Sequence, residues 1–264
     1  MRRTAGWTGL KIATYNVHKC IGLDRRRSVD RVARVIREIA PDVIALQEVV
    51  SDYGARRGAD RDQATALAER LGMTVLMGPA IERPDFAYGN VVLTRLAVAG
   101  HERYDLSCGR YEPRAIQRVD LEISGGVFHF YNTHLGTTYA ERCEQSRRLV
   151  QTDILEASRP EHPQVLVGDF NDWFSGTPSR LLGDHLYEAT RHLRPTYPSV
   201  APVLKLDRIY VNHHVRARRV WAHTTPIARI ASDHVPIVAL VEPVISSGDS
   251  DGARRGSEAL AGRI

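Results

Sequence analysis

Two short segments of this chain consist of apolar residues only, and they limit the possible folds more than any other feature. Val43–Leu46 and Val165–Val167 carry no polar side chain on either face. A strand of this kind is stable only where both of its faces are covered, as in the centre of a sheet with a layer packed on each side. An acidic residue, Glu48 or Asp169, follows each segment within two residues. The chain therefore contains buried central strands whose ends carry charge.

Three segments have the pattern of helices that cover such a sheet. Ser28 is a suitable N-cap for a helix that runs to Ala40, in which apolar residues recur at helical spacing. A second helix is expected at 63–71, ended by Gly72, and the longest at 140–157. Strands are expected at 11–16, 43–46, 74–77, 91–94, 115–123, 127–132, 164–168, 206–211, 215–222 and 235–241. This order, in two similar halves, predicts two β-sheets packed face to face with helices outside.

The composition is that of an ordinary globular chain. Its 264 residues, 43% hydrophobic and 25% charged, suffice for one large α/β domain and are too few for two. No apolar stretch reaches the roughly 18 residues of a membrane span, and Met1 to Leu10 lacks the apolar core of a signal peptide. Three cysteines without C-x-x-C spacing argue against a disulfide framework or a zinc site. We expect a cytoplasmic protein with a flexible N-terminus (1–9), one folded domain (10–243) and a disordered tail (244–264).

The net charge of +5 is compatible with anionic partners. Much of it comes from arginine clusters at 25–27, 56–57, 216–219 and 254–255. Such clusters attract phosphate-rich molecules or allow peripheral contact with an anionic membrane. A solvated, arginine-rich surface without a dedicated partner explains the same composition, so charge is only supporting information.

Polar residues stand at the ends of apolar runs throughout the chain. In stacked α/β sheets the strand ends of one edge converge, so these groups are expected to meet. Carboxylates gathered there repel one another unless a cation lies between them. Oxygen ligands suit Mg²⁺ or Mn²⁺ rather than zinc, and histidines outside zinc spacing suit phosphate binding and proton transfer. The residues concerned are Asn16, Glu48, Asn90, His134, Asp169, Asn171, Asp207, Asp233 and His234.

Six motifs around these residues occur in the order found in the endonuclease/exonuclease/phosphatase superfamily, which the sequence resembles over about residues 10–242. They are Tyr15-Asn16-Val17-His18, Leu46-Gln47-Glu48-Val49, Asn132-Thr133-His134-Leu135, Gly168-Asp169-Phe170-Asn171, Leu206-Asp207-Arg208-Ile209 and Ser232-Asp233-His234. Thr196-Tyr197-Pro198-Ser199, ahead of the fifth motif, is similar to a short bacterial branch related to lipid phosphodiesterases and to hydrolases of GPI-anchor remodelling. The resemblance implies a four-layer α/β/β/α sandwich and metal-dependent hydrolysis of a phosphoester.

The resemblance also implies a metal site and a water-activating group. Glu48 is expected to be the principal metal ligand, with Asn16 and Asp233 beside it. The expected ion is Mg²⁺, with Mn²⁺ as the alternative. Asp169 is expected to orient or deprotonate the attacking water, and the sequence leaves the general base open between Asp169 and His234.

The remaining motif residues are expected to hold the substrate phosphate. By resemblance, Asn171, His134 and Asn90 contact the phosphate oxygens. His234 faces the scissile phosphate, and Asp207 holds its ring. An imidazole supported by a carboxylate supplies a positive donor where charge develops.

Several residues have a second explanation. Arg114 suits a substrate phosphate, because guanidinium groups bind phosphate in a fork, and equally a surface ion pair. Trp173-Phe174 forms either an apolar lip for a substrate or the packing of its own loop. Asp42 and Asp172 are expected to be turn residues, and His18 a surface or packing residue.

The substrate class stays open among nucleic acid, phospholipid and a soluble phosphomonoester. The candidate loops at 51–62, 101–114 and 172–204 are modest, whereas nucleases commonly add basic loops that grip a strand. We predict a phosphodiesterase, because no lysine- and arginine-rich pocket suited to inositol polyphosphates is identifiable. A catalytically silent binding module on the same fold is the alternative. None of the main polar positions is lost, which favours an active enzyme, and the oligomeric state is not predicted.

Overall fold

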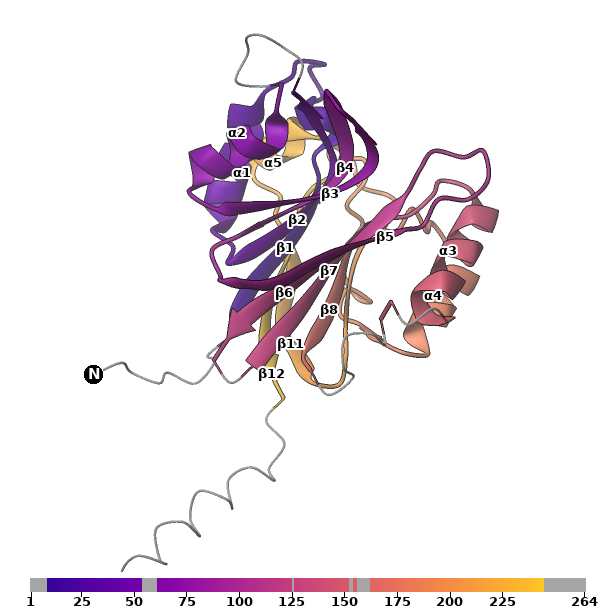
Figure 1. Cartoon of the computed structure of the whole chain (residues 1–264). Helices are drawn as coiled ribbons and strands as arrows, with labels where there is room; N and C mark the ends of the chain where they lie inside the picture. The colour runs from indigo at the N-terminus through magenta and orange to yellow at the C-terminus, as the bar shows by residue number, and fades with distance from the viewer. Residues whose placement is uncertain (1–8, 54–60, 125, 152–153, 156–161, 245–264) are drawn as a thin grey trace, which may run out of the picture.

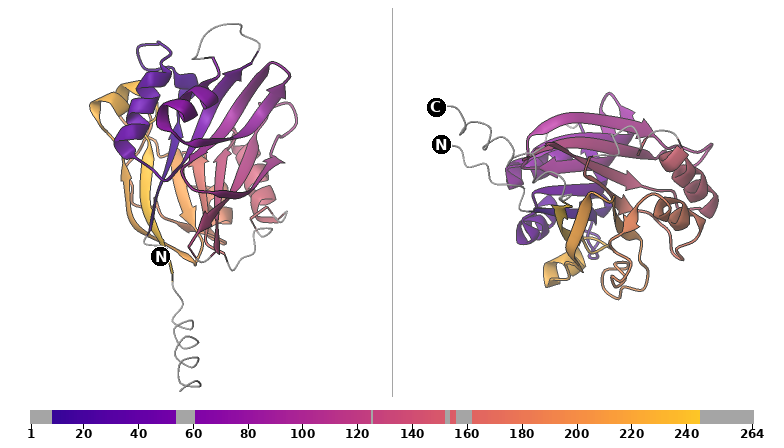
Figure 2. Two further views of the ribbon diagram at one scale, coloured as in Figure 1. Left: turned by 60° about the vertical axis from the view of Figure 1, so that its left-hand side comes forward. Right: turned by 90° about the horizontal axis from the view of Figure 1, so that it is seen from below.

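Two six-stranded mixed sheets lie face to face between two layers of helices in the computed structural model (Figure 1). The structure describes residues 9–53, 61–124, 126–151, 154–155 and 162–244. Helices α1, α2 and α5 cover the first sheet, and α3 and α4 cover the second. Figure 2 shows the two helical layers on opposite sides of the molecule. The predicted four-layer α/β/β/α sandwich is confirmed.

The first sheet has the strand order β11-β12-β1-β2-β4-β3 and the second β5-β6-β7-β8-β10-β9. The first consists of β1 (Leu10–Asn16), β2 (Val43–Asp52), β3 (Thr74–Arg83), β4 (Phe86–Thr94), β11 (Val215–Ala222) and β12 (Ile237–Pro243). The second consists of β5 (Val98–Asp105), β6 (Ala115–Ile123), β7 (Gly126–His134), β8 (Gln164–Asp169), β9 (Tyr187–Glu188) and β10 (Asp207–Val211). The helices are α1 (Val29–Ile39), α2 (Gln63–Leu71), α3 (Tyr139–Gln151), α4 (Thr177–Gly183) and α5 (Pro226–Ala231), with a short 3₁₀ turn η1 (His18–Cys20).

Both faces of the central strands are packed, which explains their apolar runs. In β8, Val165 and Val167 point into the core between the sheets, whereas Leu166 packs toward α3 and α4. The apolar residues of β2 alternate in the same way. Each such side chain removed from water contributes about 1.5–3 kcal/mol, so both sheets are held by packing on two sides.

The boundaries of the first two helices follow their capping residues. Ser28 accepts a hydrogen bond from the backbone N–H of Arg31 at 3.2 Å, and α1 ends at Ala40 in the left-handed conformation. Asp62 caps α2 in the same way, and Gly72 ends it with φ of 61°. The predicted limits of both helices are confirmed.

Besides the short turn η1, four elements of the described residues were not anticipated by the sequence pattern, and each has a physical reason to be missed. Helices α4 and α5 are seven and six residues long, and both begin with a proline in their first turn. Strand β9 has two residues, and β5 is an exposed edge strand, rich in polar residues, that overlaps the first five residues of the expected loop 101–114. Helix α3 ends at Gln151 instead of 157, and residues 154–155 form a turn.

Some expectations fall outside the described residues. The flexible N-terminus and the disordered tail are described only at Gly9 and Val244, and residues 152–153 and 156–157 of the expected long helix are not described. Within the described part of the chain, no helix is both long and apolar enough to cross a membrane.

Strand β2 does not end at Glu48, as the sequence suggested, but continues to Asp52 through a β-bulge. The register with β4 shifts between Leu46 and Val49. Glu48 has a φ of 58°, which lies in the left-handed region. A bulge of this kind redirects one side chain while the strand continues, so Glu48 is aimed by the bulge and not by a strand end.

One buried carboxamide ties the two sheets together at this bulge. The side chain of Asn132 in β7 accepts a hydrogen bond from Gln47 Nε2 at 2.8 Å. Its Nδ2 donates to the carbonyls of Leu46 and Val91, each at 3.1 Å. Asn132 therefore connects β7 to β2 and β4, and it satisfies backbone groups where the ladder between those strands is irregular.

We expect Asn132→Ala to destabilise the fold. The substitution leaves two buried carbonyls and one buried amide N–H group without their partner, and each unsatisfied buried group costs about 1–3 kcal/mol. Chemical denaturation should show a loss of at least about 2 kcal/mol in the free energy of unfolding. Glu122→Ala, at an exposed position of β6, is the control and should change stability little. A loss no larger than that of the control would contradict the bridging role.

Candidate active site

Five strands bring their polar residues to one edge of the sandwich. Strands β1, β7 and β8 end there, and β10 and β12 begin there. In the second sheet, Asp169 lies opposite both His134 and Asp207. A hydrogen bond of 3.0 Å from Asn16 Nδ2 to Asp169 Oδ2 joins the two sheets. This edge is called the site edge below, and β1 begins and β12 ends at the opposite edge.

Gly168 allows β7 and β8 to approach closely where they reach the site edge. It has a φ of 146°, and a Cβ atom there would lie 1.9 Å from the carbonyl oxygen of Thr133. The chain then places Asp169 in a buried position and turns at Asn171, which has a φ of 49°. The Gly-Asp-Phe-Asn motif therefore combines a steric requirement with two polar groups directed into the site.

The amide of Asn16 stands between two carboxylates. Its Nδ2 donates to Glu48 Oε1 at 3.1 Å and to Asp169 Oδ2 at 3.0 Å, and its Oδ1 accepts from the backbone N–H of His18 at 3.0 Å. Asn16 is 1% exposed. A neutral group thus holds two acids close together at the end of β1, in spite of their mutual repulsion.

A third acid, Asp233, faces the same space. One of its oxygens lies 3.7 Å from Nδ1 of His18. Burial, followed by the charges of Asp233, Asp169 and Glu48, raises the pKa of the Tyr197 hydroxyl. The charges of all three carboxylates therefore act on the same hydroxyl group.

His134 is held as a neutral imidazole. Its Nε2 lies 3.2 Å from Nδ2 of Asn171, which can only donate, so this nitrogen accepts. Burial, helped by the positive charges of Arg114 and His234 and opposed by Asp169, lowers the pKa of His134 to about 3. The hydrogen bond and the electrostatics therefore assign the same protonation state.

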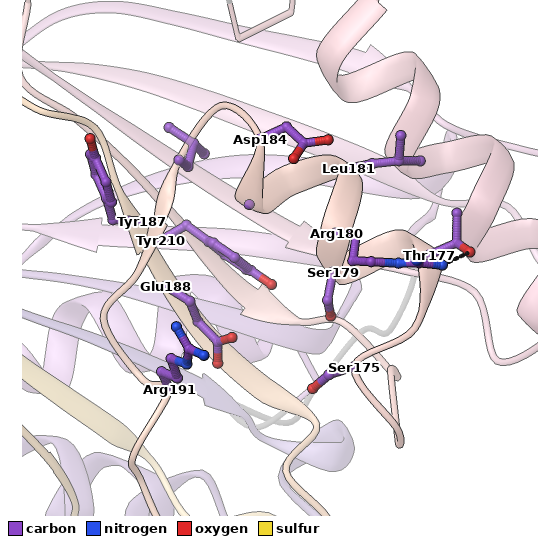
Figure 3. Close-up of a pocket in the computed structure, with 12 residues that line it drawn as sticks. Ser175, Thr177, Ser179, Arg180, Leu181, Asp184, Tyr187, Glu188, Arg191 and Tyr210 are labelled. Carbon is purple, nitrogen blue, oxygen red and sulfur yellow. Dashed lines mark hydrogen bonds between the residues drawn. The ribbon is translucent and has the colours of Figure 1, made fainter.

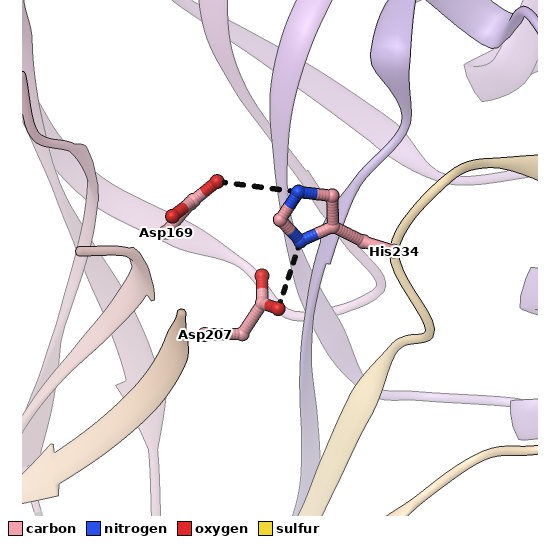
Figure 4. A group of neighbouring side chains, drawn as sticks. All are labelled: Asp169, Asp207 and His234. Atoms are coloured by element: carbon pink, nitrogen blue, oxygen red, sulfur yellow. Dashed lines mark hydrogen bonds and ion pairs between the residues drawn. The ribbon is translucent and has the colours of Figure 1, made fainter. Parts of the chain in front are cut away.

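His234 is in the opposite state. Its Nδ1 lies 2.9 Å from Asp207 Oδ2, and its Nε2 lies 3.6 Å from Asp169 Oδ2 (Figure 4). Burial disfavours the charged ring, but Asp207 and Asp169 outweigh burial and raise the pKa of His234 to about 10. Thr196 Oγ1 donates to the same oxygen of Asp207 at 2.6 Å, and the Tyr197 ring lies 4.8 Å from the imidazole. His234 is therefore a positioned cation at neutral pH.

Arg114 and Asn90, the two remaining residues expected to bind the phosphate, are both buried. Arg114 is 6% exposed and pairs with Glu112, so it is not an ordinary surface residue. Asn90 directs its Nδ2 to the carbonyls of Ala115 and Asn132, at 2.8 and 3.4 Å. In this position Asn90 connects β4 of the first sheet to β6 and β7 of the second. Its Nδ2 could contact a phosphate only if one of these hydrogen bonds were broken.

The acids around Asn16 form a suitable donor set for a hard divalent cation. Glu48, Asp169 and Asp233 offer carboxylate oxygens and Asn16 an amide oxygen, which are the ligands that Mg²⁺ and Mn²⁺ prefer. Ligand atoms of Asp169, Asp207 and His234 also lie within 4.8 Å of one another. Because both nitrogens of the protonated His234 face carboxylates, that group is better described as a hydrogen-bonded triad than as a metal site.

Asp172 is not the simple turn residue that the sequence suggested. It is 2% exposed, its backbone carbonyl accepts from Arg208 Nη2 at 2.6 Å, and its carboxylate lies 3.8 Å from the same guanidinium. The fully buried Arg208 also pairs with Glu188 at 3.4 Å. These charges fix the loop that follows Asn171.

A cavity of about 710 Å³ lies behind this ion-pair group, between α4 and strands β9 and β10 (Figure 3). Ser175, Ser179, Arg180, Glu188 and Tyr210 are among its lining residues. None of the predicted site residues lines it. This cavity therefore does not coincide with the candidate active site.

Three residues of the site were missed as contributors by the sequence analysis. His18 lies beside Asp233, Thr196 binds Asp207, and burial and Glu48 raise the pKa of the Tyr88 hydroxyl, which lies near that carboxylate. His18 and Thr196 belong to motifs that the sequence analysis quoted, so their position offered a signal. Tyr88 is one of several residues of an apolar strand, and no local pattern distinguishes it.

The sequence profile of the Endonuclease/Exonuclease/phosphatase family matches residues 13–234. The chain belongs to the endonuclease/exonuclease/phosphatase family. Members of this family are phosphoester hydrolases, and the predicted family membership is confirmed. The uncharacterized protein YbhP of Escherichia coli K12 is a relative, 27% identical over 249 residues that cover 87% of this chain and 94% of YbhP.

Solved structures of the family share the fold. The endonuclease/exonuclease/phosphatase from Beutenbergia cavernae is 24% identical with a TM-score of 0.75, covering 89% of this chain and 72% of its own. The mannosyl-6-phosphatase Bt3783 of Bacteroides thetaiotaomicron is 20% identical with a TM-score of 0.72, covering 89% and 100%. Zebrafish (D. rerio) TDP2, solved with a single-strand DNA product, is 18% identical with a TM-score of 0.69, covering 89% and 99%.

The two histidines should titrate far apart in metal-free protein. We expect NMR of the imidazole nitrogens to show His234 protonated through neutral pH and titrating near pH 10, and His134 neutral down to about pH 3. Because an unfolded histidine titrates at about pH 6.5, the raised pKa of His234 contributes stability that is complete below that pH. This contribution is lost as the pH rises through about 10. Asp207→Asn should lower the pKa of His234, and a wild-type His234 that titrates near its ordinary value would contradict the triad.

Proposed function

We propose that the protein is a Mg²⁺-dependent phosphodiesterase that hydrolyses its substrate by in-line attack of an activated water. The observation that carries this proposal is the pair of carboxylates held by the amide of Asn16, 3.1 Å from Glu48 and 3.0 Å from Asp169, beside the protonated His234. One side of the site thus gathers oxygen ligands, and the other presents a positive donor. Hydrolysis of a phosphoester requires both the oxygen ligands for a cation and the positive donor.

Glu48, Asn16 and Asp233 would hold the ion. Mg²⁺, when bound, offsets charge on the phosphate oxygens and lowers the pKa of a bound water, and Mn²⁺ can replace it. The bulge that aims Glu48 and the hydrogen bonds of Asn16 position the ligands before any ion arrives. Preorganised ligands require little rearrangement on binding.

Asp169 is the better candidate for the general base. His234 carries a proton at neutral pH because Asp207 and Asp169 outweigh its burial, so it cannot accept another. Asp169 Oδ1 accepts the backbone N–H of Asn171 at 2.9 Å, which fixes the carboxylate. Asp169 can then orient the water and take its proton, while His234 donates to the phosphate in the transition state.

Asn171 and Arg114 would hold the phosphate from the other side, and the neutral His134 would act through the Asn171 amide, whose orientation it fixes as a hydrogen-bond acceptor. The Asn171 amide donates to His134 Nε2 and to the carbonyl of Leu135, at 3.2 and 3.0 Å. Phosphate binding would draw one of these amide protons to a phosphate oxygen. The buried charge of Arg114 makes this region attractive to an anion.

A phosphodiester suits the site better than a phosphomonoester. Among the described residues, the cations close to the acids are few, chiefly Arg114, which is paired with Glu112, and His234, which is paired with Asp207. A dianionic monoester needs more positive charge than a monoanionic diester. The substrate is then a nucleic acid or a phospholipid. The similarity to a mannosyl-6-phosphatase keeps a soluble monoester as the second candidate, and a silent binding module is the alternative to an enzyme.

A reducing, cytoplasmic location is part of this proposal. Cys108 and Cys143 are free thiols. Free thiols are ordinary in the cytoplasm and uncommon in oxidising compartments.

A panel of phosphoesters tests the reaction class. We expect hydrolysis of bis-p-nitrophenyl phosphate and of either DNA or a phospholipid, abolished by EDTA and restored by Mg²⁺. The panel should include plasmid DNA, abasic DNA, cardiolipin, sphingomyelin, mannose 6-phosphate and inositol phosphates. Faster turnover of the monoesters would favour the second candidate. No EDTA-sensitive turnover on any substrate would leave the binding module as the correct description.

Substitutions at the two central residues test the mechanism. Asp169→Asn and His234→Ala should each lower kcat by about 10²–10⁴ without loss of the fold, because each removes one group that acts in the transition state. Asp184→Asn and His192→Ala, at exposed positions, are matched controls that should keep wild-type kcat. Circular dichroism should confirm that all four variants are folded. Wild-type turnover in either central variant would exclude the assigned role.

A further inference from the structure

Exposed apolar side chains gather at the site edge. Twelve large hydrophobic residues are exposed in the described part of the chain, and nine of them lie in or beside segments that border this edge. The other three, Tyr187, Leu240 and Val244, lie away from it, toward the ends of β10 and β12. The nine are Leu23, Tyr53, Tyr111, Tyr139, Trp173, Phe174, Val200, Val203 and Ile230.

Trp173 and Phe174 form a first exposed apolar tip, shortly after the loop that carries Asp169 and Asn171. Trp173 is 53% and Phe174 85% exposed, and their ring centroids are 6.3 Å apart. The preceding Asp172 is buried and paired with Arg208, so the base of the loop is fixed while the two rings point outward. They do not pack their own loop, which was one of the two explanations that the sequence left open.

A second exposed apolar tip begins next to His234, the histidine that we assign to the reaction. Tyr197 and Leu204 form an isolated β-bridge, and Val200 and Val203, 59% and 69% exposed, lie in the turn between them. The Tyr197 ring lies 4.8 Å from that of His234. Both apolar tips therefore project from the protein surface next to residues that we assign to the reaction.

Exposed arginines share the same edge. Arg25, Arg26 and Arg27 lie in the segment after β1, Arg83 lies at the turn between β3 and β4, and Arg110 lies in the segment before β6. Of the acidic neighbours, Asp24 pairs with Arg31 and Glu112 with Arg114, whereas Glu82 and Asp85 are exposed beside Arg83. Arginine beside apolar and aromatic tips is the composition of a surface that binds anionic lipid.

We propose that the site edge docks on an anionic lipid bilayer, with Trp173-Phe174 and Val200–Val203 entering the interface and the exposed arginines contacting headgroups. Val200, Val203 and Ile230 are aliphatic and cannot stack on bases, so they favour a lipid interface, whereas the aromatic and basic residues of this edge would serve a lipid interface or a nucleic-acid groove equally. The inference rests on the proposed function in one respect: it makes the phosphodiester of a membrane phospholipid the substrate of that same site.

Fluorescence of Trp173 tests the docking. The chain has three tryptophans, and in Trp7→Phe/Trp221→Phe the remaining one, Trp173, is a single reporter. With vesicles that contain phosphatidylglycerol, we expect a blue shift of its emission and co-sedimentation of the full chain. With phosphatidylcholine vesicles alone the response should be weaker, and salt should weaken binding to the phosphatidylglycerol vesicles only.

Two variants of the otherwise wild-type chain identify the surface. Trp173→Ala/Phe174→Ala should reduce the vesicle partition coefficient at least about tenfold, because both rings lose their burial in the interface. Val200→Ser/Val203→Ser, at a separate exposed tip, should also reduce it. Tyr187→Ala, 67% exposed but away from the site edge, is the control and should bind as wild type.

The outcomes distinguish docking from catalysis. Absence of vesicle binding, or binding unaffected by both pairs of substitutions, would overturn the docking surface. A Trp173 response to single-stranded DNA but not to vesicles would overturn it in favour of a nucleic-acid interface. EDTA-sensitive hydrolysis of bis-p-nitrophenyl phosphate is measured on the same preparation. Absence of this hydrolysis in a preparation that binds vesicles would refute the proposed function and leave the docking surface supported.

Discussion

Buried carboxamides that cross between the two sheets hold together the strands that carry Glu48 and Asp169. Asn132 joins β7 to β2 and β4, and Asn16 joins β1 to β8. Neutral amides suit this task, because they donate and accept hydrogen bonds without the desolvation cost of a buried charge. Gln47, which binds Asn132, directly precedes the bulged Glu48. The same contacts therefore hold the sheets in register and aim the principal acid.

Within this frame, two histidines at nearly equal distances from one carboxylate differ in charge, since His134 is neutral and His234 is a cation at neutral pH. Nε2 of His234 and Nε2 of His134 lie 3.6 and 3.7 Å from Asp169 Oδ2. His234 has a second carboxylate, Asp207, whereas His134 has the amide of Asn171 and the nearby charge of Arg114. The second neighbour thus decides the protonation state of each ring. Titratable groups whose environments separate their pKa values are typical of acid–base sites, and this separation supports the role as general base that we propose for Asp169.

The sequence predicted the features that local pattern determines. Apolar runs such as Val165–Val167 reveal buried strands, and a polar residue at the end of each run predicts a shared edge, so the fold and the convergence of the site residues were accessible. The bulge at Glu48, the bond from Thr196 to Asp207 and the place of Tyr88 depend on partners distant in the sequence, which no local pattern encodes. The buried pair of Asp172 with Arg208 was missed for the same reason, since 36 residues separate them along the chain.

The acids gathered around Asn16 form the proposed divalent-cation site, and metal binding tests this site most directly. Isothermal titration of the metal-free full chain with Mn²⁺ should show binding, and Glu48→Gln should weaken it at least about tenfold, because one anionic ligand becomes neutral. Glu82→Gln, at an exposed position, should bind as wild type, and the thermal stability of metal-free Glu48→Gln should match that of the parent. Equal affinity of Glu48→Gln and wild type for Mn²⁺ would contradict the account.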